Sequence, residues 1–279
     1  MSRPIRIEYP GAIYYITSRT PNSVLAFRDD RDKVRFLDIL TQTIKRSQWI
    51  CHGYCLMDDH YHLIVETPKG NLSQGMRQIN GIYTQEYNRR YFKKGALFKG
   101  RFKTVLFDKN ENLLNLARHI VLNPVRANLA DYASQYRWSS YKETAGLAEG
   151  KTAITKRDWI LAQFGESQQE AEQRYQDFVN NKQAATDPWR AVRYQLLLGS
   201  KEFLDRHKEF LGEPQKGKAS QDRVPLEQLF NGNSGTNRSQ RDHNICQAHL
   251  QHGYTLTEVG RHLGLHISTV SKILKKHGV

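Results

Sequence analysis

The sequence predicts an α+β fold, an antiparallel sheet with helices on one face, followed by a small all-α unit at the C-terminus. Two observations support this prediction. Strand-like and helix-like patterns alternate over roughly the first 125 residues, and a helical pattern interrupted by glycine fills roughly the last 40. No apolar run approaches the ~18 residues of a membrane span, so we expect no transmembrane segment.

The first three strands and the first helix follow from local patterns. Residues 12–17 are rich in β-branched and aromatic side chains, which favours a strand. Residues 29–47 carry apolar side chains at spacings of three and four, which indicates an amphipathic helix. Residues 49–57 and 60–66 are the next two strands, and the short Asp58-Asp59 link between them predicts an antiparallel hairpin.

A fourth strand is expected between two further helices. Asn71 is expected to cap a helix that ends near Tyr91, and residues 103–107 are typical of a strand. Asn110 is expected to cap a helix over residues 111–123, which the following proline ends. The order strand, helix, strand, strand, helix, strand, helix fits a ferredoxin-like antiparallel sheet with its helices packed on one face.

Composition divides the remaining chain, so residues 1–145 are expected to be the first domain. Residues 146–212 are polar with a helical pattern and form a helical extension, and residues 213–240 contain few apolar side chains and resemble a linker. Residues 241–279 show a helix-turn-helix pattern with Gly264 at the tight turn. The outward face of the last helix would reach DNA bases and phosphates through Ser268, Thr269, Ser271 and Lys272.

The charge balance makes nucleic acid the first candidate partner. Lys and Arg total 42 against 28 Asp and Glu, a net charge of +14. Residues 89–103 hold seven basic and no acidic side chains with aromatics between them, as in grooves that bind phosphates and stack bases. The expected DNA contacts in this segment are Arg89, Arg90, Lys93, Lys94, Lys99, Arg101 and Lys103.

Three cysteines cannot build a disulfide framework, which favours a reducing cytosol.

The motif His60-Tyr61-His62 predicts a metal site, because residues two apart on a strand point to one face. His119 and Asn123 are four apart on a predicted helix, so Asn123 could add an amide oxygen if that helix packs beneath the sheet. This set suits Mg²⁺ or Mn²⁺ with open positions for a phosphate. Purely structural histidines are one alternative. A zinc site of His60 with Cys51 and Cys55 is another, although no fourth ligand lies nearby.

Six segments, taken in order, resemble the single-tyrosine HUH transposases, and most closely the REP-associated tyrosine transposases of bacteria. The resemblance covers about residues 3–145. The segments are Arg6-Ile7-Glu8-Tyr9-Pro10-Gly11-Ala12, Leu56-Met57-Asp58-Asp59-His60-Tyr61-His62-Leu63, Gly70-Asn71-Leu72-Ser73, Phe98-Lys99-Gly100-Arg101-Phe102-Lys103, Leu122-Asn123-Pro124-Val125-Arg126-Ala127 and Trp138-Ser139-Ser140-Tyr141.

The resemblance implies a specific chemistry. In this family a tyrosine attacks a phosphodiester of single-stranded DNA beside a hairpin, forms a 5′-phosphotyrosine and frees a 3′-OH, with help from a divalent ion. Carried onto this chain, the ligands would be His60, His62 and Asn123, and Arg126 of the same motif would contact DNA. The implied partners are hairpin DNA at repetitive palindromes and duplex DNA at the helix-turn-helix. The implied location is the bacterial cytoplasm at the nucleoid, as a monomer or homodimer.

The chain departs from this pattern at one position, because His119 stands where the family has its nucleophilic tyrosine. His119 could itself attack, since imidazole can be a covalent nucleophile. It could also act as a base or extra ligand while water or another tyrosine attacks, with Tyr83 and Tyr87 as the nearest candidates by sequence. In a third interpretation the protein has lost the chemistry and is a domesticated DNA-binding regulator that keeps the transposase fold.

Overall fold

The computed structural model describes residues 6–21, 24–148, 154–181, 188–193, 196–208, 224–230, 238–250, 252, 254 and 256–276. Residues 7–206 form one compact unit, and the chain from residue 207 onward makes up most of a second. Each unit is described by itself. Within the described ranges, none of the helices is both long enough and apolar enough to cross a membrane.

The first unit is built on a five-stranded sheet with the order β2-β3-β1-β4-β5. Its strands are β1 (Ala12–Arg19), β2 (Ile50–Leu56), β3 (His60–Thr67), β4 (Lys103–Phe107) and β5 (Leu197–Leu198). The first four pair antiparallel, which confirms the α+β class and the ferredoxin-like order. The short β5 was not predicted. It pairs parallel to β4 and makes the sheet mixed.

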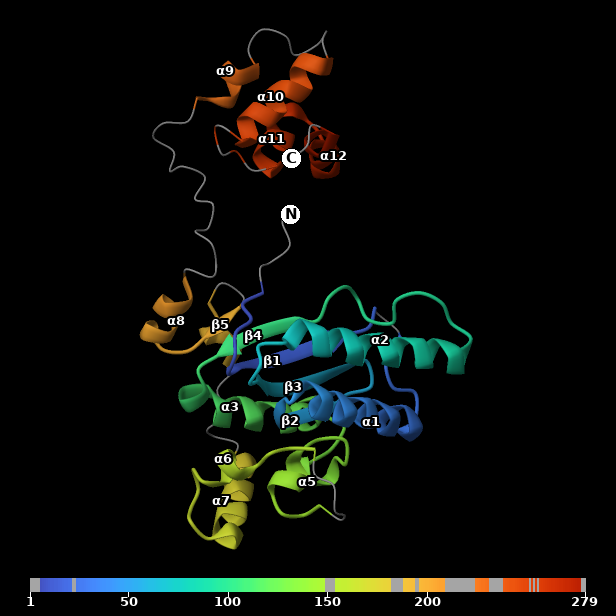
Figure 1. Cartoon of the computed structure of the whole chain (residues 1–279), viewed down its shortest axis with the longest axis vertical. Coiled ribbons are helices and arrows are strands. Elements are labelled where there is room, and N and C mark those ends of the chain that lie inside the picture. Colours follow the sequence, from blue (N-terminus) through green and yellow to red (C-terminus); the bar gives the residue numbers. More distant parts are fainter. Residues whose placement is uncertain are drawn as a thin grey trace. The chain divides into compact units, whose positions relative to one another are not determined.

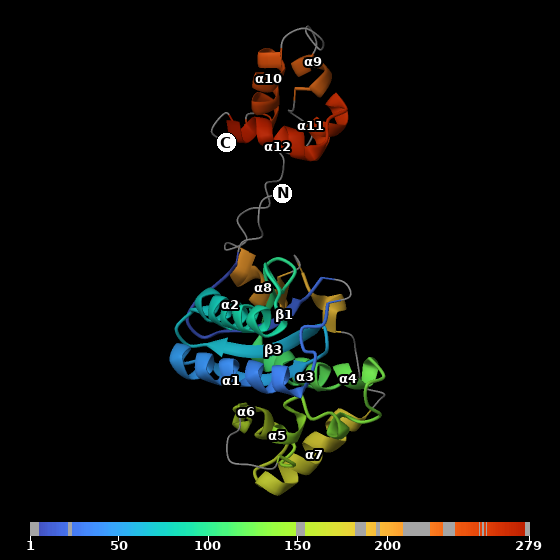
Figure 2. The same ribbon diagram turned by 90° about the vertical axis from the view of Figure 1, so that its right-hand side faces the viewer.

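Helices cover both faces of this sheet rather than one (Figures 1 and 2). Helices α1 (Asp30–Ser47) and α2 (Leu72–Tyr91) share one face, where Phe36 and Asn80 both contact Tyr61 of β3. Helix α3 (Lys109–Val121) packs on the other face, against Tyr15 and Ile64. The one-face prediction holds for α1 and α2 only. Because the second face of the sheet is also apolar, it needs a cover of its own.

The predicted end of α3 is wrong in a way that matters for the site. Asp108, rather than Asn110, caps the helix and accepts the backbone N–H groups of residues 110 and 111. The helix ends at Val121, and a short helix α4 (Asn123–Arg126) begins with Pro124 in its first turn. Asn123 therefore starts a new helix instead of continuing the face of His119.

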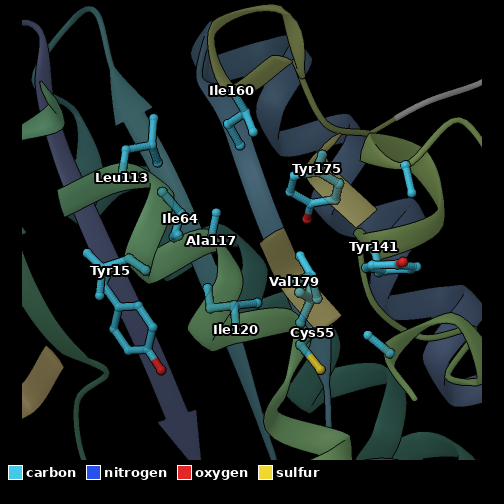
Figure 3. Packing of buried hydrophobic residues seen from close by; sticks show 14 of the residues in the cluster. Tyr15, Cys55, Ile64, Leu113, Ala117, Ile120, Tyr141, Ile160, Tyr175 and Val179 are labelled. Carbon is cyan, nitrogen blue, oxygen red and sulfur yellow. The ribbon is translucent and has the colours of Figure 1, made fainter. Parts of the chain in front are cut away.

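The predicted helical extension is part of the same core. Helices α5 (Tyr141–Thr144), α6 (Asp158–Leu161) and α7 (Gln168–Asn180) bring Tyr141, Ile160, Tyr175 and Val179 into one cluster with α3 (Figure 3). A 3-10 turn at Ala133–Gln135 precedes them, and a second at Pro188–Ala191 and helix α8 (Lys201–Lys208) follow. The predicted domain boundary at residue 145 thus lies inside one compact unit, because the apolar side chains of this segment are buried on α3.

The second unit contains four helices in its described part, α9 (Leu226–Phe230), α10 (Arg238–Leu250), α11 (Leu256–Leu263) and α12 (Ile267–Lys276). The three expected helices are present, and Gly264, with φ of 64°, lies between the last two. Part of the predicted linker is wrong, since α9 contributes Phe230 to the apolar core. The linker residues 213–223 and 231–237 lie outside the described ranges. Ser268, Thr269 and Lys272 are exposed as expected, and Ser271 is half-buried.

Candidate active site

The two histidines of the motif lie at the start of β3 and face the same side of the sheet. Their ring centroids are 4.7 Å apart and the rings are nearly perpendicular, at 88°. Across the β1–β3 pair, Arg19 lies opposite His60 and Thr17 lies opposite His62. The alternation of side chains along a strand predicted this shared face.

His62 is buried, and within the described part of the chain only one of its ring nitrogens has a partner. Nδ1 is 2.5 Å from the hydroxyl of Tyr15, whereas Nε2 has no hydrogen-bond partner within the described ranges. Burial, together with the charges of His60, His119, Arg19 and Arg126, lowers the pKa of His62 well below its ordinary value. His62 is therefore neutral at pH 7. A buried polar atom without a partner is costly, so Nε2 is the natural position for a ligand atom.

His60 is held from two sides by charged groups. Its Nδ1 contacts the carboxylate of Asp59, and Nη2 of Arg19 is 3.1 Å from the same nitrogen. Burial lowers the pKa of His60, although the hydrogen bond to Asp59 opposes that shift. The side chain of Arg19 is 61% exposed, so it presents a positive charge to solvent beside the imidazole pair.

Asn123 is attached to this site through Arg126. Nη2 of Arg126 donates to Oδ1 of Asn123 at 3.0 Å and to the backbone carbonyl of His119, while Nδ2 of Asn123 donates to the carbonyl of Ile120 at 3.2 Å. Arg126 also contributes to the lowered pKa of His62, so its charge lies close to that ring. The amide oxygen of Asn123 would have to leave Arg126 before it could bind a metal.

His119 is hydrogen-bonded to a residue from the distant 188–193 segment. Nε1 of Trp189 donates to Nε2 of His119 at 3.1 Å, and the two rings meet edge-on with centroids 5.3 Å apart. The same indole packs on Tyr15 with a centroid distance of 4.5 Å. Because Nε2 accepts the indole proton, a neutral His119 carries its own proton on Nδ1. The lone pair of Nε2 is thus already engaged, which opposes direct attack by this ring.

The two alternative tyrosines are far from this arrangement. Tyr83 and Tyr87 are buried on α2, which covers the opposite face of the sheet. Their hydroxyls donate to the backbone carbonyls of Ala26 and Leu25, at 2.6 and 2.9 Å. Burial raises the pKa of Tyr83 above its ordinary value. Both hydroxyls are engaged in hydrogen bonds within the core, so the assignment of Tyr83 and Tyr87 as nucleophiles is wrong.

The zinc alternative is also wrong. Cys51 and Cys55 are both fully buried, and burial raises the pKa of the Cys51 thiol to about 12, which disfavours the thiolate that zinc needs. Among the described residues, no three histidine, cysteine, aspartate or glutamate side chains are grouped so as to hold a metal ion. A metal at the histidine pair would therefore need a third protein ligand of another type, such as an amide oxygen.

Most of the predicted DNA-contacting cations are exposed, and some lie beside the histidines. Lys103 is opposite Thr17 in the β1–β4 pair, so it lies in one row with His62 across three strands. The backbone N–H of Lys99 donates to the carbonyl of Arg19 at 2.8 Å. Arg101, Arg89, Lys93 and Lys94 are exposed as well.

Arg90 differs from these cations. Its guanidinium donates to the carboxylates of Asp29 and Asp32, and Tyr91 donates to Asp32 at 2.8 Å. Asp32 is almost fully buried, so this network ties the end of α2 to the start of α1. Arg90 therefore has a structural role, and its prediction as a DNA contact is not supported.

Three site residues were missed by sequence reasoning, namely Tyr15, Arg19 and Trp189. Tyr15 and Arg19 belong to a strand whose pattern predicts only its secondary structure. Trp189 is a single aromatic in a polar segment, 70 residues from the histidine it contacts. The only signal in the sequence is the strand alternation, which puts Tyr15, Thr17 and Arg19 on one face.

Residues 11–121 match the family described as IS200-like transposases, and these residues span β1 to the end of α3. This segment is less than half of the chain, and over it the chain is similar to the IS200-like transposases. The match includes both histidines and His119, and it ends just before Asn123.

Two individual proteins are also similar to this chain. A REP-associated tyrosine transposase of Haemophilus influenzae is 20% identical over 167 residues, which cover 53% of this chain and 88% of the relative. A solved structure of a REP-associated tyrosine transposase bound to a REP hairpin is 16% identical, with a TM-score of 0.45. That match covers 56% of this chain and 94% of the other. By the sequence comparison, the chain is similar to a REP-associated tyrosine transposase.

Proposed function

We propose that this protein nicks single-stranded DNA beside hairpins of palindromic repeats and transfers the cut strand, in a reaction that depends on a divalent metal. The observation that carries this proposal is the pair His60 and His62, neutral and on one face, with Nε2 of His62 buried and unpartnered in the described part of the chain. The similarity of residues 11–121 to the IS200-like transposases supports transposase chemistry at this position.

The proposed ion is Mg²⁺ or Mn²⁺, held by His60, His62 and Asn123. When bound, such an ion would polarise a DNA phosphate and neutralise its developing charge. Tyr15 has a raised pKa because of burial and stays protonated, so its oxygen can accept Nδ1–H of His62. That arrangement leaves the Nε2 lone pair available to the ion and fixes the ring orientation. Release of Asn123 from Arg126 would free its amide oxygen and a guanidinium for the phosphate.

His119 occupies the nucleophile position, and we propose that it assists the attack of water, for nicking, or of the 3′-OH of a second strand, for strand transfer, on the phosphodiester. The Trp189 hydrogen bond orients the ring and engages the lone pair of Nε2, so the ring would act through Nδ1–H as the proton donor to the leaving oxygen. Direct attack through Nε2 would first require that this hydrogen bond break. A phosphohistidine is therefore the less favoured of the two enzymatic routes.

The function is tested with the full-length protein, a labelled DNA hairpin with single-stranded flanks, and Mn²⁺ or Mg²⁺. We expect cleavage of one strand at a defined position, and removal of the metal with a chelator should abolish it. A covalent adduct, seen as a retarded band on a denaturing gel and assigned by mass spectrometry, would identify the attacking side chain. Intact binding without cleavage in either metal would contradict the nicking proposal.

A second candidate function is a DNA-binding regulator that retains the fold without its chemistry. The specific observation in its favour is His119, which replaces the family's tyrosine and whose Nε2 is already bonded to Trp189. This alternative predicts hairpin binding that is independent of metal and of His62. Either function would place the protein at the bacterial nucleoid in the cytoplasm, as a monomer or a homodimer.

Simultaneous replacement of Lys99, Arg101 and Lys103 by alanine should flatten the salt dependence of hairpin binding. On single strands each phosphate contact contributes about 0.7 to the slope of log K against log salt, so the slope should fall by about 2. Fluorescence anisotropy between 50 and 300 mM salt measures it. The matched control is Arg90→Ala, which removes a cation that is already paired with carboxylates. An unchanged slope in the triple variant would remove these residues from the DNA path.

The C-terminal unit is proposed to bind duplex DNA through α12. Lys272 is exposed on this helix beside Ser268 and Thr269, so Lys272→Glu should weaken duplex binding about 10-fold and leave hairpin nicking unchanged. Gel-shift titration with duplex repeats measures the first effect and the cleavage assay the second. Loss of nicking instead would assign α12 to the catalytic unit.

A further inference from the structure

Phe92 is the most exposed large hydrophobic side chain among the described residues, at 95%. It directly follows α2, inside the basic segment 89–103. The other aromatics of that segment have structural roles: Tyr91 bonds to Asp32, Phe98 is buried against Tyr61 and Phe102 is half-buried. Phe92 alone presents its ring to solvent, so packing does not account for its position.

The backbone at Phe92 is also unusual. Its φ is 52°, in the left-handed region that glycine normally occupies at the end of a helix. The turn is nevertheless well anchored, because the N–H groups of Phe92 and Lys93 both donate to the carbonyl of Asn88. The side chain of Asn88 donates to the carbonyl of Gly95 at 2.8 Å. A bulky residue kept in such a conformation, and fully exposed, suggests a function for its ring.

The surroundings of Phe92 are strongly positive. Arg89, Lys93 and Lys94 are exposed, and the sequence contains no acidic residue between Glu86 and Asp108. The loop that follows α2 leads back to β4 in Figure 1, and Lys99 within it bonds to Arg19, next to His60. A strand held by this loop would run between Phe92 and the histidine pair.

We propose that Phe92 is a stacking platform for an unpaired base of single-stranded DNA, with the phosphates on the cations of the same loop. This inference rests on the proposed function and adds a contact for the single strand that flanks the hairpin. Aromatics set among cations are typical of single-strand sites, because every base offers a π-face. A duplex keeps its bases stacked on one another and offers no such face. A protein partner would need an apolar patch, whereas this loop has one exposed aromatic ring, so single-stranded DNA is the better fit.

The test is the affinity of Phe92→Ala for a hairpin with a single-stranded flank, measured by anisotropy without metal. One lost stacking contact should weaken binding about 5- to 150-fold. The salt slope should not change, because no charge is removed. Phe92→Tyr and Phe92→Trp should bind like the wild type, and stacking should quench the fluorescence of the introduced tryptophan. A blunt hairpin should bind all variants equally.

A DNA strand with one abasic nucleotide identifies the base. At the stacked position the abasic site should remove the difference between wild type and Phe92→Ala, and elsewhere in the flank the difference should remain. Phe92→Gly should bind weakly yet unfold no earlier than the wild type, since glycine suits this φ. Leu147→Ala, at another exposed apolar residue, is the control and should bind normally.

Three results would overturn the inference. Equal affinity of wild type and Phe92→Ala for the flanked hairpin, with cleavage intact, would overturn the stacking role alone. Equal weakening of blunt and flanked hairpins would likewise show that Phe92 acts on something other than an unpaired base. A wild-type protein that binds no single-stranded flank at all would overturn both this inference and the proposed function.

Discussion

Replacing His62 by alanine should lower the rate of hairpin cleavage by about 10³-fold or more and leave hairpin binding within about threefold. The substitution removes the buried Nε2, and a catalytic ion supplies several kcal/mol of transition-state stabilisation, at 1.36 kcal/mol for each factor of ten. Single-turnover cleavage in Mn²⁺ measures the rate, and calorimetric titration of Mn²⁺ into the DNA complex measures metal binding.

Two further variants sharpen this prediction. Tyr15→Phe removes only the hydroxyl that orients His62, and it should weaken Mn²⁺ binding about 10- to 100-fold without abolishing cleavage at high metal. His243→Ala removes an exposed histidine of the other unit and should cleave like the wild type. If His62→Ala cleaved normally, the histidine pair would not be the metal site of the cleavage reaction.

Replacing Phe36 by alanine should destabilise the first unit by about 3–5 kcal/mol, the range for deletion of a fully buried aromatic ring. Phe36 lies on α1, and its ring is 4.6 Å from Tyr61, 5.2 Å from Tyr83 and 5.3 Å from Phe27, measured between centroids. The cavity would open directly beneath β3, next to the strand residue between the two histidines.

Urea unfolding followed by tryptophan fluorescence measures this loss. All four tryptophans belong to residues 7–206, so the signal reports on the first unit alone. Val34→Ala on the same helix is the matched control, because its side chain is 47% exposed and its replacement should cost less than about 0.5 kcal/mol. A loss below about 1 kcal/mol for Phe36→Ala would contradict the tight ring cluster between α1, α2 and β3.

Part of the candidate site could be read from local patterns. The alternation along residues 60–66 puts both histidines on one face, and the periodicity of residues 29–47 gives the helix that buries Phe36. Both features depend on the rise and turn of a single element, so a short stretch of sequence determines them. The resemblance in sequence to known transposases identified the same histidines and the position of His119.

The tertiary structure alone decided what surrounds those residues. It decided which face of the sheet α3 covers. It also decided two contacts between distant segments: His62 contacts Tyr15, 47 residues away, and His119 contacts Trp189, 70 residues away. The break before Asn123 comes from a helix end that Asp108 and Pro124 shift by two residues. Local periodicity cannot specify such contacts, because they depend on how complete elements dock through the apolar faces of the sheet. The sequence by itself determined the order of strands and helices, the paired imidazoles and the basic loop. The docking of helices and strands on one another decided which polar groups contact the imidazoles and His119.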